Sequence, residues 1–155
     1  MSDQRLDEDA ETLYNAVNRL VRRYQFRDRE RICCHGISVT QCYGLEWLVE
    51  SGPMRLKPFA DHLMLDASTA SRVVNALVRK KLITRMEDPD DRRAVLLTVT
   101  DAGRSLYGTI RRELVEEERS LIADMSEAER RGAIKLLQRL DQAASRRIAP
   151  TAPSD

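Results

Sequence analysis

Residues 66–104 read DASTASRVVNALVRKKLITRMEDPDDRRAVLLTVTDAGR, and this stretch decides the fold. Its first part has apolar side chains at helical spacing, and two later runs, 82–86 and 94–99, are rich in β-branched residues. The residues between those runs, 87–93, have the composition of a turn. The stretch therefore predicts a helix over about 66–81, followed by a two-stranded antiparallel ribbon.

The predicted helix has two faces of different chemistry. Its apolar residues recur at i, i+3, i+4, i+7 and i+8 and would pack inward: Ala70, Val73, Val74, Leu77 and Val78. The opposite face carries the hydroxyl, amide and guanidinium groups of Ser68, Ser71, Arg72, Asn75 and Arg79. Such groups bind base edges and phosphates, but any surface helix also has a polar outer face.

The ribbon decides between these two interpretations. Arg92 and Arg93 would lie at its tip, where exposed cations contribute little to folding. A ribbon tip is narrow enough to enter the minor groove of DNA, and arginine is the favoured side chain there. The helix and the ribbon together therefore predict double-stranded DNA as a partner.

The rest of the chain is predicted to be mostly helical. Capping boxes at 38–41 and 126–129 and apolar periodicity place helices over about 6–31, 38–50, 100–125 and 126–147, with a short helix around Pro58. The order helix–helix–strand–turn–strand is that of a winged helix-turn-helix. The long terminal helices have apolar faces too large for one small core, so we expect them to pack against a second copy.

The predicted fold class is therefore mostly α with a small β-wing, a winged helix-turn-helix flanked by long N- and C-terminal dimerisation helices. We expect one intertwined domain. Its segments are the N-terminal dimerisation helix with a cysteine-bearing connector (1–37), the winged helix-turn-helix DNA-binding region (38–100), the C-terminal dimerisation helices (101–147) and a flexible tail (148–155).

Composition bounds the class of protein. The 155 residues are 42% hydrophobic and 33% charged, with a formal net charge of +1. No apolar run reaches the ~18 residues of a membrane span, and the acidic, polar N-terminus is unlike a secretory signal. We therefore expect a cytoplasmic protein without membrane contact. The near-neutral total hides segregated charge, such as the six arginines of 19–31, and so remains compatible with a local basic face.

Three stretches of this sequence resemble the MarR (multiple antibiotic resistance) family of dimeric winged-helix DNA-binding regulators. They are SVTQCYGLEWL (38–48), LDASTASRVVNALVRKKLITR (65–85) and DPDDRRAVLLTVTDAGR (88–104). The last is the most specific, because an Asp-x-Arg wing followed by a strand and LTVTDAG is close to a family signature. Two positions depart from the family pattern: Lys81 stands where glycine is common, and Gly44 lies inside the second helix.

The resemblance implies roles for individual residues. The major-groove helix would contribute Ser68, Thr69, Ser71, Arg72 and Asn75. Arg93 would be the wing arginine, with Asp91 orienting it through a salt bridge and Arg92 contacting a phosphate. The resemblance also implies a homodimer formed by the first helix and the last two, and a cleft near Tyr43 and Trp47 that could take a small aromatic acid.

All three thiols of the chain, Cys33, Cys34 and Cys42, fall within ten residues. One interpretation is structural, because cysteine is often a small buried hydrophobe. A second is a soft metal or metalloid site with three thiolates and His35 as a fourth ligand. A third is a redox switch, because a thiol at a helix N-terminus or beside Arg31 can have a lowered pKa. The metal or metalloid site ranks slightly above the switch, because three sulfurs exceed the two that a disulfide needs.

The sequence contains no catalytic motif: no Gly-rich phosphate loop, no His-Glu-x-x-His and no patterned set of Ser, His and acid. We therefore expect no enzyme, with a small thiol-dependent reductase as the alternative. The expected function is a sequence-specific transcriptional regulator, a repressor that an effector releases from a pseudo-palindromic operator. The effector would be a thiophilic metal or metalloid ion at the cysteines, an oxidant or an organic acid. Such an ion is the one cofactor that the sequence suggests.

Overall fold

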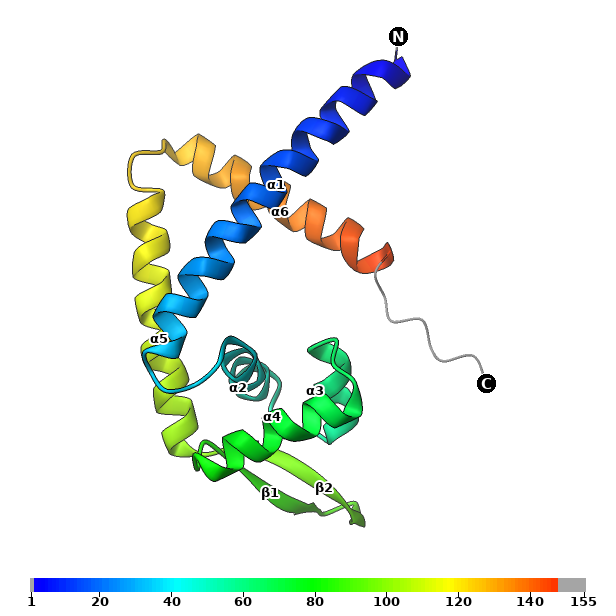
Figure 1. The fold of residues 1–155 in the computed structure, drawn as a ribbon, viewed down its shortest axis with the longest axis vertical. Coiled ribbons are helices and arrows are strands. Elements are labelled where there is room, and N and C mark those ends of the chain that lie inside the picture. Colours follow the sequence, from blue (N-terminus) through cyan, green and yellow to red (C-terminus); the bar gives the residue numbers. More distant parts are fainter. Residues whose placement is uncertain (1, 148–155) are drawn as a thin grey trace.

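The computed structural model describes residues 2–147 of the chain (Figure 1). Its elements are α1 (Ser2–Cys33), α2 (Val39–Ser51), α3 (Leu56–His62), α4 (Ala67–Arg79), β1 (Ile83–Asp88), β2 (Asp91–Val99), α5 (Asp101–Leu121) and α6 (Glu127–Arg147). The two strands pair antiparallel. The mostly helical fold with a two-stranded wing is the predicted one, whereas the predicted tail at 148–155 lies outside the described residues.

Side-chain caps start the helices where the sequence predicted them. Ser38 accepts the N–H of Gln41 at 3.1 Å, and the Gln41 side chain accepts the N–H of Ser38, so the predicted capping box of α2 is present. Asp66 caps α4 by accepting the N–H of Thr69 at 2.8 Å, and Thr100 caps α5 in the same way. These bonds satisfy donors that the first turn of a helix leaves free.

Lys81 follows α4 at the position where glycine usually ends a helix, and it adopts the left-handed conformation that glycine would adopt there. Lys81 has a φ of 59°, and α4 therefore ends at Arg79, slightly earlier than predicted. The N–H of Lys81 donates to Val78 and that of Leu82 to Leu77, which together form a Schellman motif. The departure from glycine at this position does not prevent the turn.

Other boundaries also differ from the prediction, and α1 spans Ser2–Cys33 rather than about 6–31. α5 ends at Leu121 rather than at about Met125. The strands reach Asp88 and Asp91, so the predicted seven-residue turn over 87–93 shrinks. The turn was predicted from the polar composition of 87–93, but the strands remain paired through some of these polar residues.

The core lies where the helices α2 to α5 meet the wing. Its largest fully buried side chains are Phe59, Ile32, Leu45, Leu48, Leu77, Ile83, Ile110 and Val74. The inner face predicted for α4 is confirmed, because Ala70, Val74 and Leu77 are buried and Val73 and Val78 pack against the core. Gly44 marks a close approach, since an added Cβ would lie 2.7 Å from the ring of Phe59.

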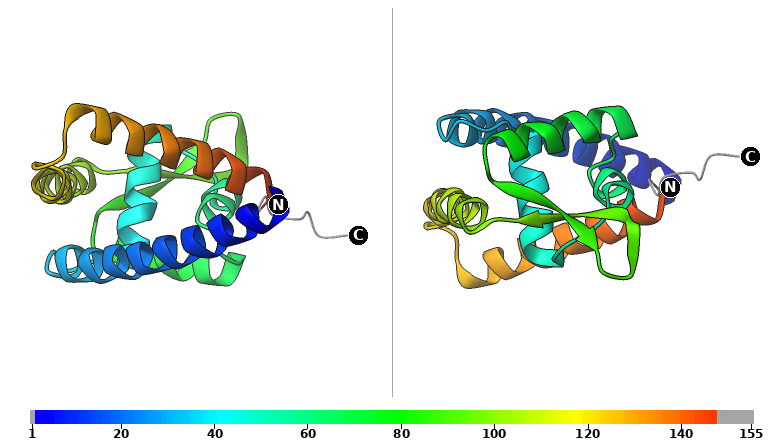
Figure 2. Two further views of the ribbon diagram at one scale, coloured as in Figure 1. Left: turned by 90° about the horizontal axis from the view of Figure 1, so that it is seen from above. Right: turned by 90° about the horizontal axis from the view of Figure 1, so that it is seen from below.

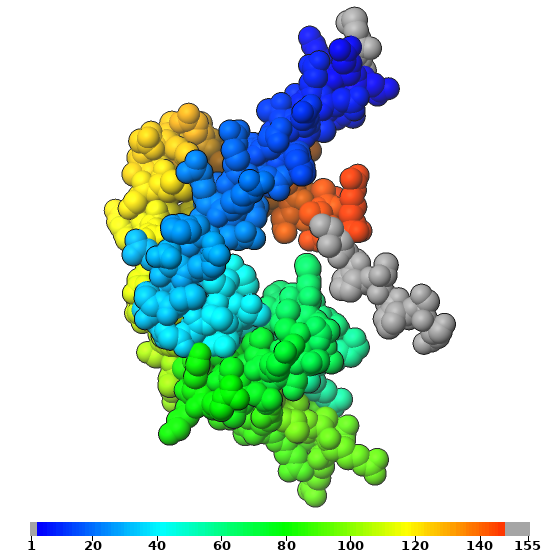
Figure 3. Space-filling view, viewed as in Figure 1, coloured from blue at the N-terminus to red at the C-terminus, as the bar shows by residue number. Residues whose placement is uncertain are grey.

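α1 and α6 extend away from this core. The N-terminal half of α1 protrudes from the molecule (Figure 3), and along α1 Leu13 and Leu20 are each 42% exposed. No residue of α6 is buried, and Ile134 and Leu137 are more than half exposed. Large apolar faces are therefore uncovered within a single chain. Within residues 2–147, no helix is both long and apolar enough to cross a membrane.

The C-terminal end of α4 is tied to the connector between α1 and α2. The Lys80 ammonium group donates to the carbonyl oxygen of Gly36 at 2.6 Å and to Oε1 of Gln41 at 2.8 Å. Gly36 has a φ of 76°, which glycine adopts without strain. The connector and α4 are thus joined although 44 positions separate Lys80 from Gly36.

Candidate nucleic-acid interface

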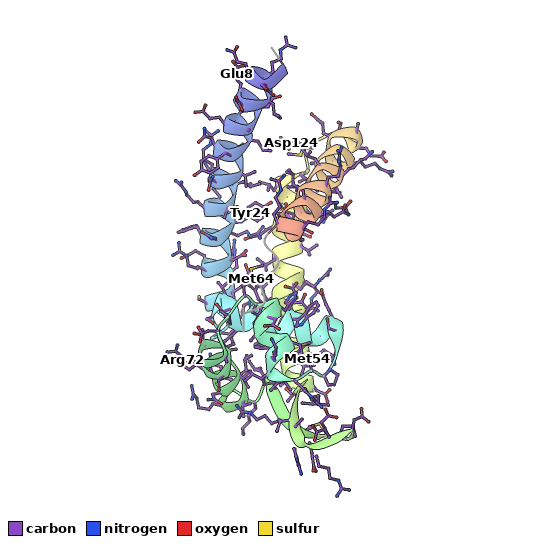
Figure 4. All side chains as sticks on the ribbon, turned by 90° about the vertical axis from the view of Figure 1, so that its right-hand side faces the viewer. Glu8, Tyr24, Met54, Met64, Arg72 and Asp124 are labelled. Carbon is purple, nitrogen blue, oxygen red and sulfur yellow. The ribbon has the colours of Figure 1, made fainter. Side chains whose placement is uncertain are left out.

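One face of the molecule combines the outer side of α4 with the wing. Figure 2, seen from below, shows α4 alongside the two strands, and Figure 4 shows Arg72 on the outer side of α4. Ser68, Arg72, Asn75 and Arg79 are exposed, whereas Thr69 and Ser71 are half-buried. The fold thus brings the polar residues of the predicted major-groove helix to the side where the wing lies.

Five guanidinium groups stand on α4 and the wing without a carboxylate partner. They belong to Arg72, Arg79, Arg85, Arg92 and Arg93, which are all exposed. None of them forms an ion pair within the part of the chain that the structure describes. Unpaired guanidinium groups can fork onto phosphates or base edges, and their attraction for a polyanion needs no rearrangement of the protein.

The N-terminal turn of α4 holds Arg72 through a chain of hydrogen bonds. The Thr69 hydroxyl donates to Asp66 at 2.6 Å and accepts from Nη2 of Arg72 at 3.2 Å. The bonds from the side chain and backbone of Thr69 lower the pKa of the Asp66 carboxyl, which favours its ionised form. Asp66 therefore caps the helix, and Thr69 links this cap to Arg72 in the free protein.

Asn75, in the middle of α4, is engaged by the wing. Nη2 of Arg85 on β1 donates to Oδ1 of Asn75. The sequence identified Asn75 as a candidate contact but not Arg85, because nothing in the spacing of the two residues indicates that strand and helix meet there.

Arg92 and Arg93 lie in β2, beside the turn rather than within it. Asp88 pairs with Asp91, whereas the next pair is Glu87 with Val95, so β2 bulges between the two pairs. Bulges bend a strand and redirect its side chains. Both arginines are exposed on this bulge, near the end of the wing where the sequence predicted them.

The predicted salt bridge between Asp91 and Arg93 is wrong. Oδ1 of Asp91 instead accepts the backbone N–H of Arg93 at 3.1 Å, and its other oxygen lies 3.8 Å from Arg55. The main partner of Arg55 is Asp88, with Nη2 at 2.7 Å and Nε at 3.0 Å from Oδ2. These bonds lower the pKa of the buried Asp88 carboxyl. Arg55, which precedes α3 and which the sequence did not identify, therefore anchors the wing.

The cysteines do not converge on one site. Cys42 is buried against the core, and burial, followed by the charges of Glu46 and Asp28, raises the pKa of its thiol to about 12. Cys33 and Cys34 are exposed at the end of α1, and His35 bonds instead to Glu113 at 2.8 Å.

No three His, Cys, Asp or Glu side chains among residues 2–147 are grouped to hold a metal ion. The predicted four-residue metal site is therefore not assembled. The reason is that Cys42 lies on the inner side of α2, whereas the other two thiols face outward from α1.

A cavity of about 320 Å³ lies between α1, α2 and α5. Tyr43, Tyr107 and Arg111 contribute polar groups to its wall, and Ile110 and Leu114 contribute apolar ones. The two phenols donate to carboxylates, Tyr43 to Asp28 and Tyr107 to Glu46, each at 2.9 Å. Trp47 lies outside this cavity and stacks on His62, with ring centroids 3.5 Å apart.

Comparison with known proteins gives consistent results. A sequence model described as the MarR family matches residues 37–95. The HTH-type transcriptional regulator YxaD of Bacillus subtilis (strain 168) is 37% identical over 99 residues, which are 64% of this chain and 69% of that protein. A MarR family protein from Bacillus stearothermophilus has a similar fold, with a TM-score of 0.84 and 19% identity over 90% of this chain and 97% of the other.

A third similar protein is described together with a small molecule. It is BpsR of Bordetella bronchiseptica, whose structure has a TM-score of 0.67 and 25% identity, covering 82% of this chain and 91% of that one. That structure is described as the mechanism for regulation of BpsR DNA binding by 6-hydroxynicotinic acid.

Proposed function

This chain belongs to the MarR family of DNA-binding transcriptional regulators, and from that premise we propose that it is a homodimeric repressor. In this proposal the two copies of α4 occupy successive major grooves of a pseudo-palindromic operator, with half-sites about one helical turn apart. The wings contact the adjacent minor grooves. An effector bound near the junction of α1, α2 and α5 releases the dimer.

One observation carries the DNA-binding part of this proposal: five exposed arginines stand on α4 and the wing without an ion pair among the described residues. α4 is long enough to lie in a major groove, and the bulged end of the wing presents Arg92 and Arg93 beyond it. The exposed side chains of α4 are polar apart from Ala67, whereas the wing also exposes Met86 and Val95.

The dimer is supported by a groove and by an uncovered helix. The groove, of about 910 Å³, lies between α1 and α5, and Leu20, Tyr24 and Leu121 give its wall an apolar surface among four arginines and three glutamates. The helix α6 exposes its apolar residues within a single chain. Because helix and groove both present uncovered apolar side chains, we place α6 of a second copy in this groove.

Arg93→Ala tests the role of the wing. We expect weaker binding to a selected operator by about 1–3 kcal/mol if Arg93 enters the groove, and a salt dependence of affinity reduced by about one unit. Fluorescence anisotropy over a salt series measures both.

Arg119→Ala is the matched control, because it removes an equally exposed guanidinium from α5, which pairs only with Glu116. It should bind DNA as the wild type does. Identical affinities of wild type and Arg93→Ala at every salt concentration would remove the wing from the interface.

The cavity between α1, α2 and α5 supports a small aromatic acid as effector. The guanidinium group of Arg111, which forms no ion pair among the described residues, suits the carboxylate of an aromatic acid, although Glu46 and Glu118 also line the wall, and the volume is that of a small-molecule site. The regulation of BpsR by 6-hydroxynicotinic acid supports the same class of ligand. A panel of hydroxylated aromatic acids should contain one that releases DNA from the wild type but not from Arg111→Gln.

Thiol chemistry is the second candidate, favoured by the exposure of Cys33 and Cys34. Adjacent exposed thiols can bind a thiophilic ion such as arsenite, or react with an oxidant, whereas burial raises the pKa of the Cys42 thiol to about 12 and so disfavours its reactive thiolate at neutral pH. If this candidate holds, arsenite or peroxide releases DNA from the wild type and from Cys42→Ser, but not from the Cys33→Ser/Cys34→Ser double variant. A response by the double variant would exclude Cys33 and Cys34 as the sensor.

A further inference from the structure

We propose that Arg85 of the wing determines which bases Asn75 of α4 can read, by holding the carbonyl oxygen of the Asn75 amide. This inference rests on the proposed DNA-binding role of α4. Arg85 is then a specificity-determining residue that acts through Asn75, from a different element of the fold.

The wing directs Arg85 toward α4. Side chains alternate along a strand, so Arg85 shares a face of the sheet with Ile83 and with its cross-strand partner Leu97. Ile83 and Leu97 are only 1% and 3% exposed, which shows that this face is turned toward the helices. Farther along β1 the same row emerges at the surface beside α4, where Nη2 of Arg85 donates to Oδ1 of Asn75.

The orientation of the Asn75 amide follows from the chemistry of arginine. A guanidinium group has five N–H donors and no acceptor, so only the oxygen of an amide can face it. The NH₂ group of Asn75 therefore points away from Arg85 on the exposed side of α4. No other assignment of the oxygen and nitrogen positions would leave this contact attractive.

A fixed amide reads fewer base edges than a free one. A free asparagine recognises adenine by accepting from N6 and donating to N7 at the same time. The bond from Arg85 occupies one lone pair of this oxygen and turns it toward the wing, so the fixed amide of Asn75 presents its NH₂ donors to a base edge rather than the paired donor and acceptor. Guanine then fits best, because both its N7 and its O6 accept hydrogen bonds. Thymine fits less well with its one acceptor, O4, and cytosine offers only a donor.

The inference is tested by selection from a randomised duplex DNA library with the full chain and two variants. The wild type should enrich guanine or thymine at the position that Asn75 contacts. In Asn75→Asp, Arg85 pairs with one carboxylate oxygen and the other accepts, so the preference should shift to the amino groups of cytosine or adenine, by about tenfold in relative affinity. In Arg85→Met the amide is free to turn, so the enrichment of adenine relative to guanine should increase at this position and at no other.

Arg92→Met is the matched control, since it removes another cation from the wing without contacting Asn75. It should lower affinity for all sequences and leave every base preference in place. If Asn75→Asp selects the same bases as the wild type, or if Arg85→Met leaves the ratio of guanine to adenine unchanged, the inference fails while DNA binding stands. If the wild type enriches no sequence at all, the proposed function fails with it.

Discussion

Lys81 has a backbone conformation that side chains other than glycine rarely adopt. Its φ is 59°, and Met64 closes α3 in the same way with a φ of 54°. A Cβ atom in this left-handed region meets the following carbonyl, at a cost of roughly 1–2 kcal/mol. Both helices of the DNA-reading unit, α3 and α4, therefore end in turns that store a small amount of strain.

Lys81→Gly should stabilise the protein. The glycine relieves the strain while the Schellman hydrogen bonds remain, and the greater freedom of glycine in the unfolded chain offsets part of the gain. We expect the free energy of unfolding to rise by about 1 kcal/mol, measured by urea denaturation. Lys81→Ala removes the same charge but keeps the Cβ, so an equal gain for that variant would show that strain is not the cause.

Single residues could be predicted from the sequence where a local pattern marks them. Asn75 and Arg72 follow from the polar face of a helix, and both lie where that face predicts. Arg55 and Arg85 could not be found in this way, because their partners are 33 and 10 positions away on other elements. Long-range side-chain pairs leave no periodic signal in a single sequence.

At the scale of elements, the wing depends on one buried carboxylate. Oδ2 of Asp88 accepts from Arg55, and Oδ1 accepts the N–H of Asp90 in the turn. The sheet itself has only two strands, which form a marginal unit without support. Asp88 therefore fixes the end of the wing, with its arginines, relative to α3.

Asp88→Asn should weaken DNA binding although it removes a negative charge. The amide can still accept in the turn, but it loses the ion pair with Arg55, so we expect affinity for a selected operator to fall on the order of five-fold, about 1 kcal/mol. Asp90→Asn removes an equal charge from the same turn without that contact, and by electrostatics alone it should bind DNA slightly more tightly. Anisotropy titrations that move both variants in the same direction would contradict the anchoring role.

The starts of α2, α4 and α5 were predicted closely, whereas the ends of α4 and α5 were not, for a physical reason. Starts are marked by side chains that cap free N–H groups, as Ser38, Asp66 and Thr100 do. Ends are usually marked by glycine, and here Lys81 closes α4 while Ile122 ends α5. The strands were placed correctly but too short, because backbone pairing continues through the charged residues that composition assigned to the turn.

At the scale of the whole molecule, the terminal helices should make the protein a dimer. Ile134 and Leu137 lie one turn apart on α6 and are 54% and 55% exposed. Burying each against a second copy contributes on the order of 1–2 kcal/mol. We expect Ile134→Glu/Leu137→Glu to sediment as a monomer at micromolar concentration, whereas Gln138→Glu sediments as the wild type does. A monomeric wild type would refute the dimer.

The order and class of the elements could be predicted, but not the site at the cysteines. The fold class follows from local patterns that survive in any environment. Cys33 and Cys42, by contrast, are close in the sequence but do not share a site. The chain changes direction between α1 and α2, so the Cys33 thiol is exposed and the Cys42 thiol is buried. Nearness along the chain indicates a shared site only when both residues lie on the same face of the same element.

The bond between Lys80 and the connector has a mechanical consequence. It fastens the trailing end of α4 to the hinge at Gly36, from which the long helix α1 projects. Because α1 is long and the connector at Gly36 is short, a rotation of α1 about the connector would also change the orientation of α4, which Lys80 attaches to it. A molecule that wedges open the joint between the two copies could thus disengage α4 from DNA without coming near it.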